Sequence, residues 1–509
     1  MATYYVNTAI GSNANTVVQA QTSSTPWKTI SAIFTSGSAG NTYYVVSGSY
    51  CEDNGSGRAL WNVSFSPPIN VIALSGSVQV SGSYHATDNL IIGGYGVNFN
   101  GLQFINSNNT QNTTIRTTGV PNSYSFSSCT FSLDSKNRSG SGTDSNCFSI
   151  GGGTGYIFNN CIFNNINTNP NEYEIQLIFS TGSGLLSASI NGCNFYGNSS
   201  SGKLFAIKAV TSSLQISSCS FYTYGGAIGG TAIAGLNSKL NFVGCRSSGS
   251  SQDIVLNNYS TCSISNCSFD ARGGNSTPLN VSQCNLTLQN SSFIGTYYGA
   301  SIGLDGYDTS YYVTGTINNC IFTSVSSSGH SLLIGSGVNG MIIGGCNINE
   351  NSGGYGIVLK NCINTTIQHC TIYGGCLSAV YFKASSYTTM SNCNIICNGE
   401  IPPSVGSIEI AIDSSTGNIP HNNQFTNNTI TLNGLAKYYS IGGDVSGSIF
   451  DNNWVYINNN NNLGNIFATT ISSSSQIASA WSASYSGSTN DSNTWFIYPT
   501  NKQVSVYWT

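Results

Sequence analysis

The chain has 509 residues, of which only 6% are charged, and its formal net charge is −4. Binding of nucleic acid relies on clustered cations, whereas the 14 lysines and arginines of this chain are scattered, so the composition argues against a nucleic-acid partner. No apolar stretch approaches the roughly 20 residues that a membrane span needs, so we expect no membrane span.

Residues 1–50 are expected to form an N-terminal cap and the first strands. The stretches Tyr4-Tyr5-Val6 and Tyr43-Tyr44-Val45-Val46 favour strands, and Thr29 to Phe34 favours a short capping helix between them. The first residues show neither a basic region nor an apolar region, so no signal peptide is expected in the given chain.

One short motif recurs along residues 51–430. It consists of an apolar residue, two small polar residues, a cysteine, any residue and a second apolar residue. Successive cysteine positions lie 22 to 35 residues apart, which is a period typical of solenoids, so we predict a parallel β-coil of about 14 turns. The motif cysteines are Cys129, Cys161, Cys193, Cys219, Cys245, Cys267, Cys320, Cys346, Cys370 and Cys393; Ser291 and Asn428 take the same position in degenerate copies.

The residue before each motif cysteine is Ser, Asn, Gly or His, and never a β-branched residue. Gly and Asn tolerate positive φ best, and His follows them. We therefore predict a left-handed backbone residue at this position in every turn, with the cysteine and its apolar neighbours pointing inward and stacking on their equivalents in the next turn.

The 17 cysteines are interpreted as structural thiols. Their number is odd, and cysteine packs well as a small hydrophobe, so we expect the motif cysteines to be buried, reduced and aligned in one column. This favours assembly in a reducing compartment, with secretion as the alternative. The closest Cys/His group, Cys362, His369, Cys370 and Cys376, lacks the paired spacing of a zinc site, and we predict no metal or other cofactor.

Residues 431–509 are expected to hold the last turns and a C-terminal cap. The repeat loosens there, and the aromatic stretch from Trp495 to Trp508 is suited to closing the end, with a helix near Ile477 to Ser482. Longer turns occur at Ser132 to Asn146 and at Cys397 to Asn423. Because loops on a rigid coil commonly carry function, we expect these two loops to be contact surfaces.

The opening of the chain resembles that of the pectate-lyase-like right-handed parallel β-helix superfamily, in which a Tyr-Tyr-Val strand, a Pro-Trp-Lys-Thr-Ile segment and a Val-x-x-Gly-x-Tyr strand recur in this order. The Asn-Asn-Cys-x-Phe turns are similar to that superfamily too. The resemblance covers essentially the whole chain and implies an all-β, single-domain, right-handed parallel β-helix with caps. It is specific for fold, since the superfamily includes lyases, hydrolases, tailspikes and non-enzymatic surface proteins.

A local resemblance supports an enzymatic alternative. The segment from Gly329 and His330 to Ser336 looks like a Gly-His-Gly-x-x-Ile-Gly-Ser segment of polygalacturonases, and Lys360 ends a stretch similar to their Gly-x-Arg-Ile-Lys run. Counted from the motif positions, Asp305, His330 and Lys360 would lie on a similar arc of successive turns, with Asp308 as a second carboxylate. The paired aspartates of that family are missing, and Val358 stands where it has arginine.

Tyrosine pairs indicate a binding surface. Tyr297-Tyr298 and Tyr311-Tyr312 would each send one ring outward, which suits sugar rings or a protein partner. The alternative interpretation is that tyrosine simply favours strands.

The missing catalytic set, the thiols and the absent signal peptide lead to one main hypothesis. We expect a non-enzymatic structural or adhesive β-helix, part of a virus particle or another surface assembly, that contacts sister copies or other shell proteins and also polysaccharide. The alternative is a polysaccharide hydrolase or lyase that works in a groove along the helix.

Overall fold

The structure is a computed structural model. It describes residues 1–52, 59–82, 88–106, 113–118, 124–134, 145–151, 153–167, 174–199, 203–225, 231–249, 252–257, 260–271, 276–303, 312–326, 329–350, 353–375, 378–398, 406–411, 422–432, 437–442, 449–457, 467–469 and 502–507. Two compact units make up the chain: the N-terminal unit, Met1–Val255, and the C-terminal unit, Leu256–Thr509.

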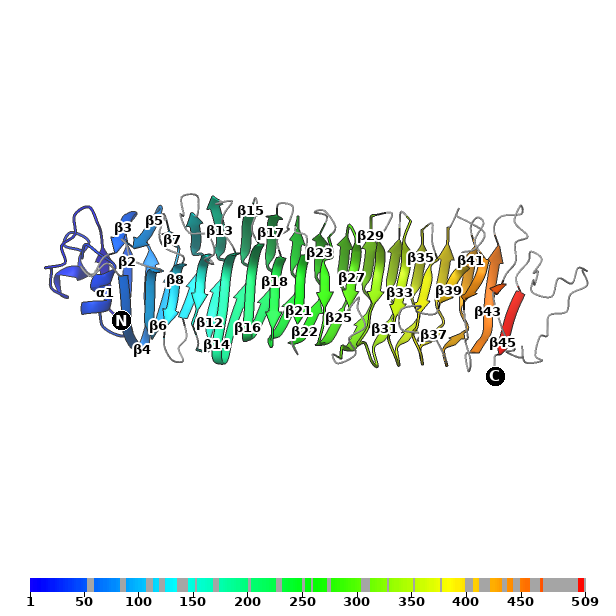
Figure 1. Cartoon of the computed structure of the whole chain (residues 1–509). Coiled ribbons are helices and arrows are strands. Elements are labelled where there is room, and N and C mark those ends of the chain that lie inside the picture. The colour runs from blue at the N-terminus through cyan, green and yellow to red at the C-terminus, as the bar shows by residue number, and fades with distance from the viewer. Residues whose placement is uncertain are drawn as a thin grey trace, which may run out of the picture. The chain divides into compact units, whose positions relative to one another are not determined.

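Short strands form almost all of the N-terminal unit (Figure 1, blue to green). Its elements are β1 (Thr3–Val6), the 3-10 helix η1 (Gln19–Gln21), α1 (Ser31–Ser36), β2 (Thr42–Val45), β3 (Gly48–Glu52), β4 (Ala59–Ala73), β5 (Val78–Gly82), β6 (Asp88–Asn100), β7 (Leu102–Asn106), β8 (Thr113–Thr118), β9 (Tyr124–Ser127), β10 (Thr130–Asp134), β11 (Ser145–Ile150), β12 (Tyr156–Asn159), β13 (Ile162–Asn167), β14 (Glu174–Asn191), β15 (Asn194–Ser199), β16 (Lys203–Ser217), β17 (Ser220–Gly225), β18 (Thr231–Leu236), β19 (Lys239–Val243) and β20 (Arg246–Ser248). Strand β21 (Gln252–Asn257) crosses the boundary between the units.

The C-terminal unit is also built of strands. They are β22 (Ser260–Ser265), β23 (Ser268–Ala271), β24 (Leu279–Val281), β25 (Cys284–Gln289), β26 (Ser292–Gly295), β27 (Tyr298–Ile302), β28 (Thr314–Asn318), β29 (Ile321–Ser324), β30 (His330–Ile334), β31 (Ile342–Gly344), β32 (Asn347–Glu350), β33 (Tyr355–Lys360), β34 (Thr366–Gln368), β35 (Thr371–Gly374), β36 (Val380–Lys383), β37 (Thr389–Ser391), β38 (Asn394–Cys397), β39 (Gly406–Ala411), β40 (Gln424–Thr426), β41 (Thr429–Leu432), β42 (Lys437–Gly442), β43 (Ile449–Ile457), β44 (Phe467–Thr469) and β45 (Lys502–Tyr507).

In the N-terminal unit each strand pairs in parallel with the equivalent strand of the next turn. The first apolar residue of the motif stacks on its equivalent, as the rings of Phe126 and Phe158 show with centroids 5.2 Å apart. Burial of such a ring contributes about 1.5 to 3 kcal/mol. The buried residues that pair in register in this row are Tyr43, Val71, Phe99, Phe126, Phe158, Ile190, Ile216 and Phe242.

The C-terminal unit repeats this arrangement with aliphatic side chains. The buried residues that pair in register in its corresponding row are Ile264, Leu288, Ile317, Ile343, Ile367, Met390 and Phe425. The predicted parallel β-solenoid is therefore confirmed, although the number of turns differs slightly from the predicted value.

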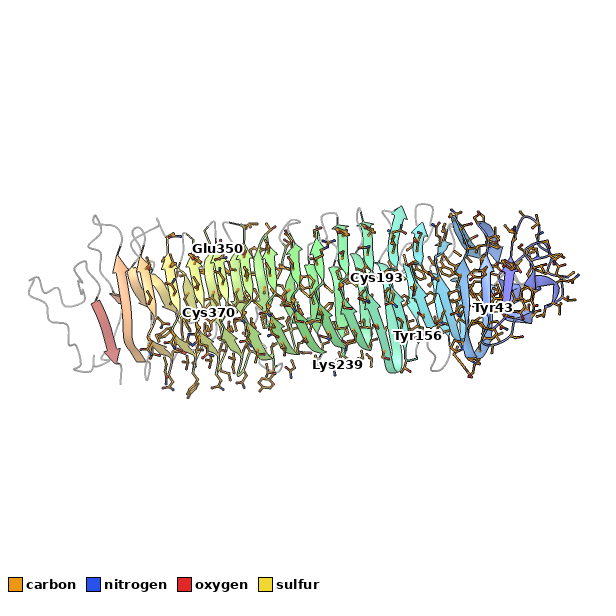
Figure 2. All side chains as sticks on the ribbon, turned by 180° about the vertical axis from the view of Figure 1, so that it is seen from behind. Tyr43, Tyr156, Cys193, Lys239, Glu350 and Cys370 are labelled. Atoms are coloured by element: carbon orange, nitrogen blue, oxygen red, sulfur yellow. The ribbon has the colours of Figure 1, made fainter. Side chains whose placement is uncertain are left out.

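Every predicted left-handed position has positive φ. The residues are Ser128, Asn160, Gly192, Ser218, Gly244, Asn266, Asn290, Asn319, Gly345, His369, Asn392 and Asn427, with φ between 49° and 64°. The residue that follows each of them, a cysteine at ten of these twelve positions and Ser291 or Asn428 at the other two, is at most 4% exposed, and all described cysteines are free thiols. All ten motif cysteines are buried, as expected, and Cys193 and Cys370 lie in the interior of their units (Figure 2).

A capping segment covers the first strand, β1. The Trp27 ring is buried and stacks on Tyr4, with ring centroids 5.8 Å apart. The Trp27 amide donates to the carbonyl of Tyr5 at 3.0 Å, and the Trp27 carbonyl accepts from Asn7 at 2.8 Å. These bonds satisfy the edge of β1, which would otherwise be open to another chain. The short helix expected between the first two strands is present as α1.

The last described strand, β45, pairs antiparallel with β43, unlike the parallel strands before it. Trp495, Trp508 and the expected helix near Ile477 to Ser482 lie outside the described residues, as do large parts of the two long loops at 132–146 and 397–423.

Candidate functional site: an aromatic corner in the C-terminal unit

Three successive turns of the C-terminal unit place aromatic residues at the start of a strand. Tyr298 begins β27, His330 begins β30 and Tyr355 begins β33. The three residues pair in register, Tyr298 with His330 and His330 with Tyr355. All three are half-buried, as is Tyr381 on the next strand, β36. We call Tyr297, Tyr298, His330, Tyr355 and Tyr381 the aromatic corner.

The rings of the aromatic corner are tilted where they flank His330. The imidazole centroid lies 5.4 Å from the ring of Tyr298 at an interplanar angle of 44°, and 5.2 Å from the ring of Tyr355 at 60°. By contrast, Tyr355 and Tyr381 stack at 4.6 Å and 14°, so each hides one ring face of the other. The tilted rings of Tyr298, His330 and Tyr355 therefore do not cover one another face to face.

Two backbone contacts hold His330. Its amide donates to the carbonyl of Tyr297 at 2.9 Å, and its Nδ1 accepts from the amide of Tyr355 at 3.4 Å. Because an accepting ring nitrogen carries no proton, this contact assigns the proton of the neutral imidazole to Nε2. In this tautomer Nε2 of His330 is a donor.

Glycines at this corner allow successive turns to pack with their backbones in direct contact. A Cβ on Gly354 would lie 1.4 Å from the carbonyl oxygen of Gly329, and a Cβ on Gly329 would lie 1.9 Å from the carbonyl oxygen of Tyr297. Only glycine fits such an approach. The Gly329-His330 pair therefore has a packing reason that is independent of any catalytic motif.

A buried carboxylate lies beside this corner and was missed by the sequence analysis. Glu350 ends β32, is only 2% exposed, and accepts a hydrogen bond from the amide of Gly353 at 3.4 Å (Figure 2). Strand alternation was the available signal, because Glu350 lies two residues after the inward Ile348 and so shares its face.

The structure separates the histidine and lysine of the enzymatic alternative. His330 pairs with Tyr355 at the start of β33, whereas Lys360 ends that strand and pairs with Lys383. Five strand steps amount to about 16 Å, so Lys360 and His330 do not share the expected arc. Asp305, Asp308 and Tyr311 lie outside the described residues.

The two tyrosine pairs have different surroundings. Tyr297 and Tyr298 belong to the aromatic corner, with ring centroids 4.3 Å apart. Tyr312 is 62% exposed and does not belong to the aromatic corner. The next residue, Val313, forms an isolated parallel β-bridge with Val338. The tyrosine and histidine candidates, proposed for separate reasons, thus converge at Tyr298 and His330.

No group of three or more His, Cys, Asp or Glu side chains in the described ranges is arranged to hold a metal ion. Within the same ranges, no helix is long and apolar enough to cross a membrane.

Comparison with known proteins gives a fold and no activity. Residues 304–462 match the family described as right handed beta helix region. No curated protein matches the chain significantly in sequence. The predicted resemblance to the right-handed parallel β-helix superfamily is confirmed.

Three solved structures illustrate this fold. The A-module of the mannuronan C-5 epimerase AlgE4 from Azotobacter vinelandii is 12% identical with a TM-score of 0.29, covering 87% of this chain and 96% of its own. The surface adhesin PfbA of Streptococcus pneumoniae is 12% identical with a TM-score of 0.32, covering 80% and 91%. The Dettilon tailspike protein is 10% identical with a TM-score of 0.29, covering 90% and 68%. Similarity at this level transfers no activity to this chain.

Proposed function

Starting from a right-handed parallel β-helix, we propose that this protein is a non-enzymatic, adhesive structural protein that binds a glycan at the aromatic corner. The observation that carries the proposal is the tilted set of half-buried rings at Tyr298, His330 and Tyr355, held on three strands in register. Aromatic faces pack against the apolar faces of sugar rings, and the His330 imidazole places a polar aromatic group between the two tyrosines.

Rigidity supports binding at this corner. The backbone contacts at Gly329 and Gly354 and the parallel pairing of β27, β30 and β33 fix the rings before any ligand arrives. A preorganised site loses little conformational entropy on binding, which compensates for a small contact area.

Binding is tested with the purified full chain by isothermal titration calorimetry against soluble neutral and acidic polysaccharides. We expect Tyr298→Ala and Tyr355→Ala each to weaken binding about fivefold, since one aromatic contact contributes about 1 kcal/mol. Tyr387→Ala is the matched control, because Tyr387 is 53% exposed and lies outside the corner. Equal losses in all three variants, or no binding by the unmodified protein, would contradict the proposal.

The alternative is a polysaccharide hydrolase or lyase, and the feature in its favour is the buried Glu350, which accepts from the amide of Gly353, two residues before Tyr355. It predicts turnover of one of the same polysaccharides, measured as new reducing ends or as unsaturated products, and abolition of that turnover by His330→Ala. In the adhesive proposal no turnover accompanies binding. Turnover that depends on His330 would replace the proposal by the alternative.

We also propose that the protein works inside an assembly, as a component of a virus particle or another surface structure, in contact with sister copies or other shell proteins. The low charged fraction of 6% supports this, because little charge repulsion keeps copies apart. Light scattering on the full chain, with and without the loops at 132–146 and 397–423, tests it. A monomer at high concentration with both loops present would count against self-assembly.

A further inference from the structure

The motif thiols act as hydrogen-bond donors in addition to filling the core. In the N-terminal unit the Sγ of Cys219 lies 3.2 Å from the carbonyl oxygen of Ser217 and 3.5 Å from that of Ile190, one turn earlier. Cys161, Cys193 and Cys245 show the same pair of contacts. Each thiol therefore connects two turns of the coil.

The C-terminal unit repeats this contact pattern. Cys346, Cys370 and Cys393 each have Sγ within 3.4 Å of the carbonyl two residues earlier and 3.8 Å from a carbonyl of the preceding turn. Each of these thiols is at most 2% exposed. The same chemistry at the same position in both units indicates that the fold requires a donor there.

Each of the two natural replacements of cysteine keeps one of these donated hydrogen bonds and also accepts one from a backbone amide. Ser291 Oγ donates to the carbonyl of Gln289 at 2.8 Å and accepts from the amide of Cys267 at 3.1 Å. Asn428 donates through Nδ2 to the carbonyl of Met390 at 3.1 Å and accepts from the amide of Cys393 at 3.0 Å. The position thus requires a small side chain that both donates and accepts.

A cysteine linked to glutathione fulfils neither requirement. Its sulfur carries no proton to donate, and the attached tripeptide has no room in a slot where the sulfur is shielded from water. A reduced thiol in the folded coil, in turn, is out of reach of an oxidant. The redox state of the motif cysteines therefore determines whether the unfolded chain can fold. Once the chain has folded, an oxidant can no longer change that redox state.

We propose that the cysteine columns form a one-way redox gate on folding: the chain folds only while these thiols are reduced, and the folded protein then keeps them reduced in oxidising surroundings. This inference is independent of the proposed glycan binding. It implies that folding precedes any transfer of the protein to an oxidising environment.

The blocking reaction is thiol–disulfide exchange on the unfolded chain. A motif cysteine loses its proton, its thiolate attacks one sulfur of glutathione disulfide, and a new S–S bond to the chain forms as the S–S bond of glutathione disulfide breaks. The other glutathione leaves as a thiolate and takes up the proton. Reduction by dithiothreitol reverses the modification.

The experiment uses the full chain with Cys51→Ser and Cys376→Ser, which remove the exposed thiol and the one outside the described residues. One sample is treated with glutathione disulfide while folded, and another is treated in denaturant and then diluted to refold. Mass spectrometry counts bound glutathione, and circular dichroism with thermal melting reports the fold. We expect an unmodified, fully folded first sample and a modified second sample that refolds only after dithiothreitol is added.

Two outcomes would overturn the gate: modification of the motif cysteines in the folded protein, or refolding of the modified chain without a reductant. A variant with all ten motif cysteines changed to serine, the residue found at Ser291, keeps the five other buried cysteines, Cys147, Cys262, Cys284, Cys362 and Cys397. It therefore separates the effect of the motif thiols from the effect of these five. If it folds, its refolding yield after glutathione disulfide treatment should exceed that of the parent at least severalfold. If it does not fold, the two treatments of the parent chain still decide the matter.

Discussion

The amide of Cys161 donates a hydrogen bond to the thiol sulfur of Cys193, one turn later in the coil, at 3.4 Å. The next turn thus satisfies a buried backbone donor of the turn before it. The bonds from Cys267 to Ser291 and from Cys393 to Asn428 have the same direction. A backbone donor buried at a bend has no strand partner, so this contact explains why the position never holds a purely apolar residue among the copies of the motif.

Replacing Cys193 tests the value of this contact. Cys193→Ala leaves the Cys161 amide buried without its acceptor, and we expect it to lower the free energy of unfolding by about 1 to 3 kcal/mol. Cys193→Ser keeps both the donor and the acceptor, as Ser291 does, and we expect a smaller loss. Urea denaturation followed by circular dichroism measures both. Equal destabilisation by alanine and serine would show that only packing matters at this position.

The thiols of Cys161 and Cys193 should also resist alkylation at raised pH. The adjacent thiol of Cys129 raises the pKa of Cys161 to about 12, as does that of Cys161 for Cys193, and burial adds to both effects. At pH 9 both sulfurs therefore stay protonated and unreactive. Iodoacetamide labelling read by mass spectrometry should modify the exposed Cys51 and leave Cys161 and Cys193 intact. Labelling of Cys161 or Cys193 at the rate of Cys51 would contradict this prediction.

Local chemistry was enough to predict the repeating bend. Asn266 and His369 were assigned positive φ from residue type alone, and both have φ of 54°. The hydrogen bonds of the cysteines were not predictable in this way, because they join residues of different turns. The sequence analysis treated cysteine as a small hydrophobe, which explains its burial and leaves out its role as a donor and acceptor.

The aromatic corner shows why offsets along the chain failed to locate the site. Tyr298, His330 and Tyr355 lie 7, 10 and 9 residues after their motif positions, yet they pair in register. The segment between the motif and the next strand differs in length from turn to turn. These differences in length account for the unequal offsets of residues that pair in register. Similar offsets of 10 and 14 residues therefore placed His330 and Lys360 on a similar arc, whereas strand pairing places Tyr355 beside His330.

Glycine substitutions test the close packing of this corner. In Gly354→Ala the new Cβ meets the carbonyl oxygen of Gly329 at 1.4 Å, which forces the backbone apart and should cost about 3 kcal/mol or more. Gly344→Ala is the control, since its Cβ would meet side chains and no backbone: the end of Asn318 at 3.1 Å and Gln368 at 3.9 Å. Thermal unfolding should show a large loss for the first variant and a small one for the second. If Gly354→Ala unfolds at the same temperature as the unmodified protein, backbone contact does not hold the aromatic corner together.

The last prediction concerns the carboxylate that fixes the capping helix. Glu52 is 1% exposed and accepts hydrogen bonds from the amides of Ile30 and Ser31 at 2.8 Å each, and from the Ser31 hydroxyl. Glu52→Ala leaves these donors without an acceptor. We expect it to destabilise the cap by about 2 to 3 kcal/mol, seen as faster proteolysis of residues 1–50 and altered fluorescence of the buried Trp27.

The pH dependence of the cap follows from the same burial. Desolvation raises the pKa of Glu52 above its ordinary value, although the hydrogen bonds from Ser31 and Ile30 oppose the shift. The folded state then holds the Glu52 proton more tightly than the unfolded state does. The resulting contribution to the free energy of unfolding is complete below the ordinary glutamate pKa and is lost as the pH rises through the raised pKa. Acidification across this window should slow proteolysis of the cap in the unmodified protein. The same pH change should have less effect in Glu52→Gln, which does not titrate, and an identical pH profile in both proteins would exclude Glu52 as the titrating group.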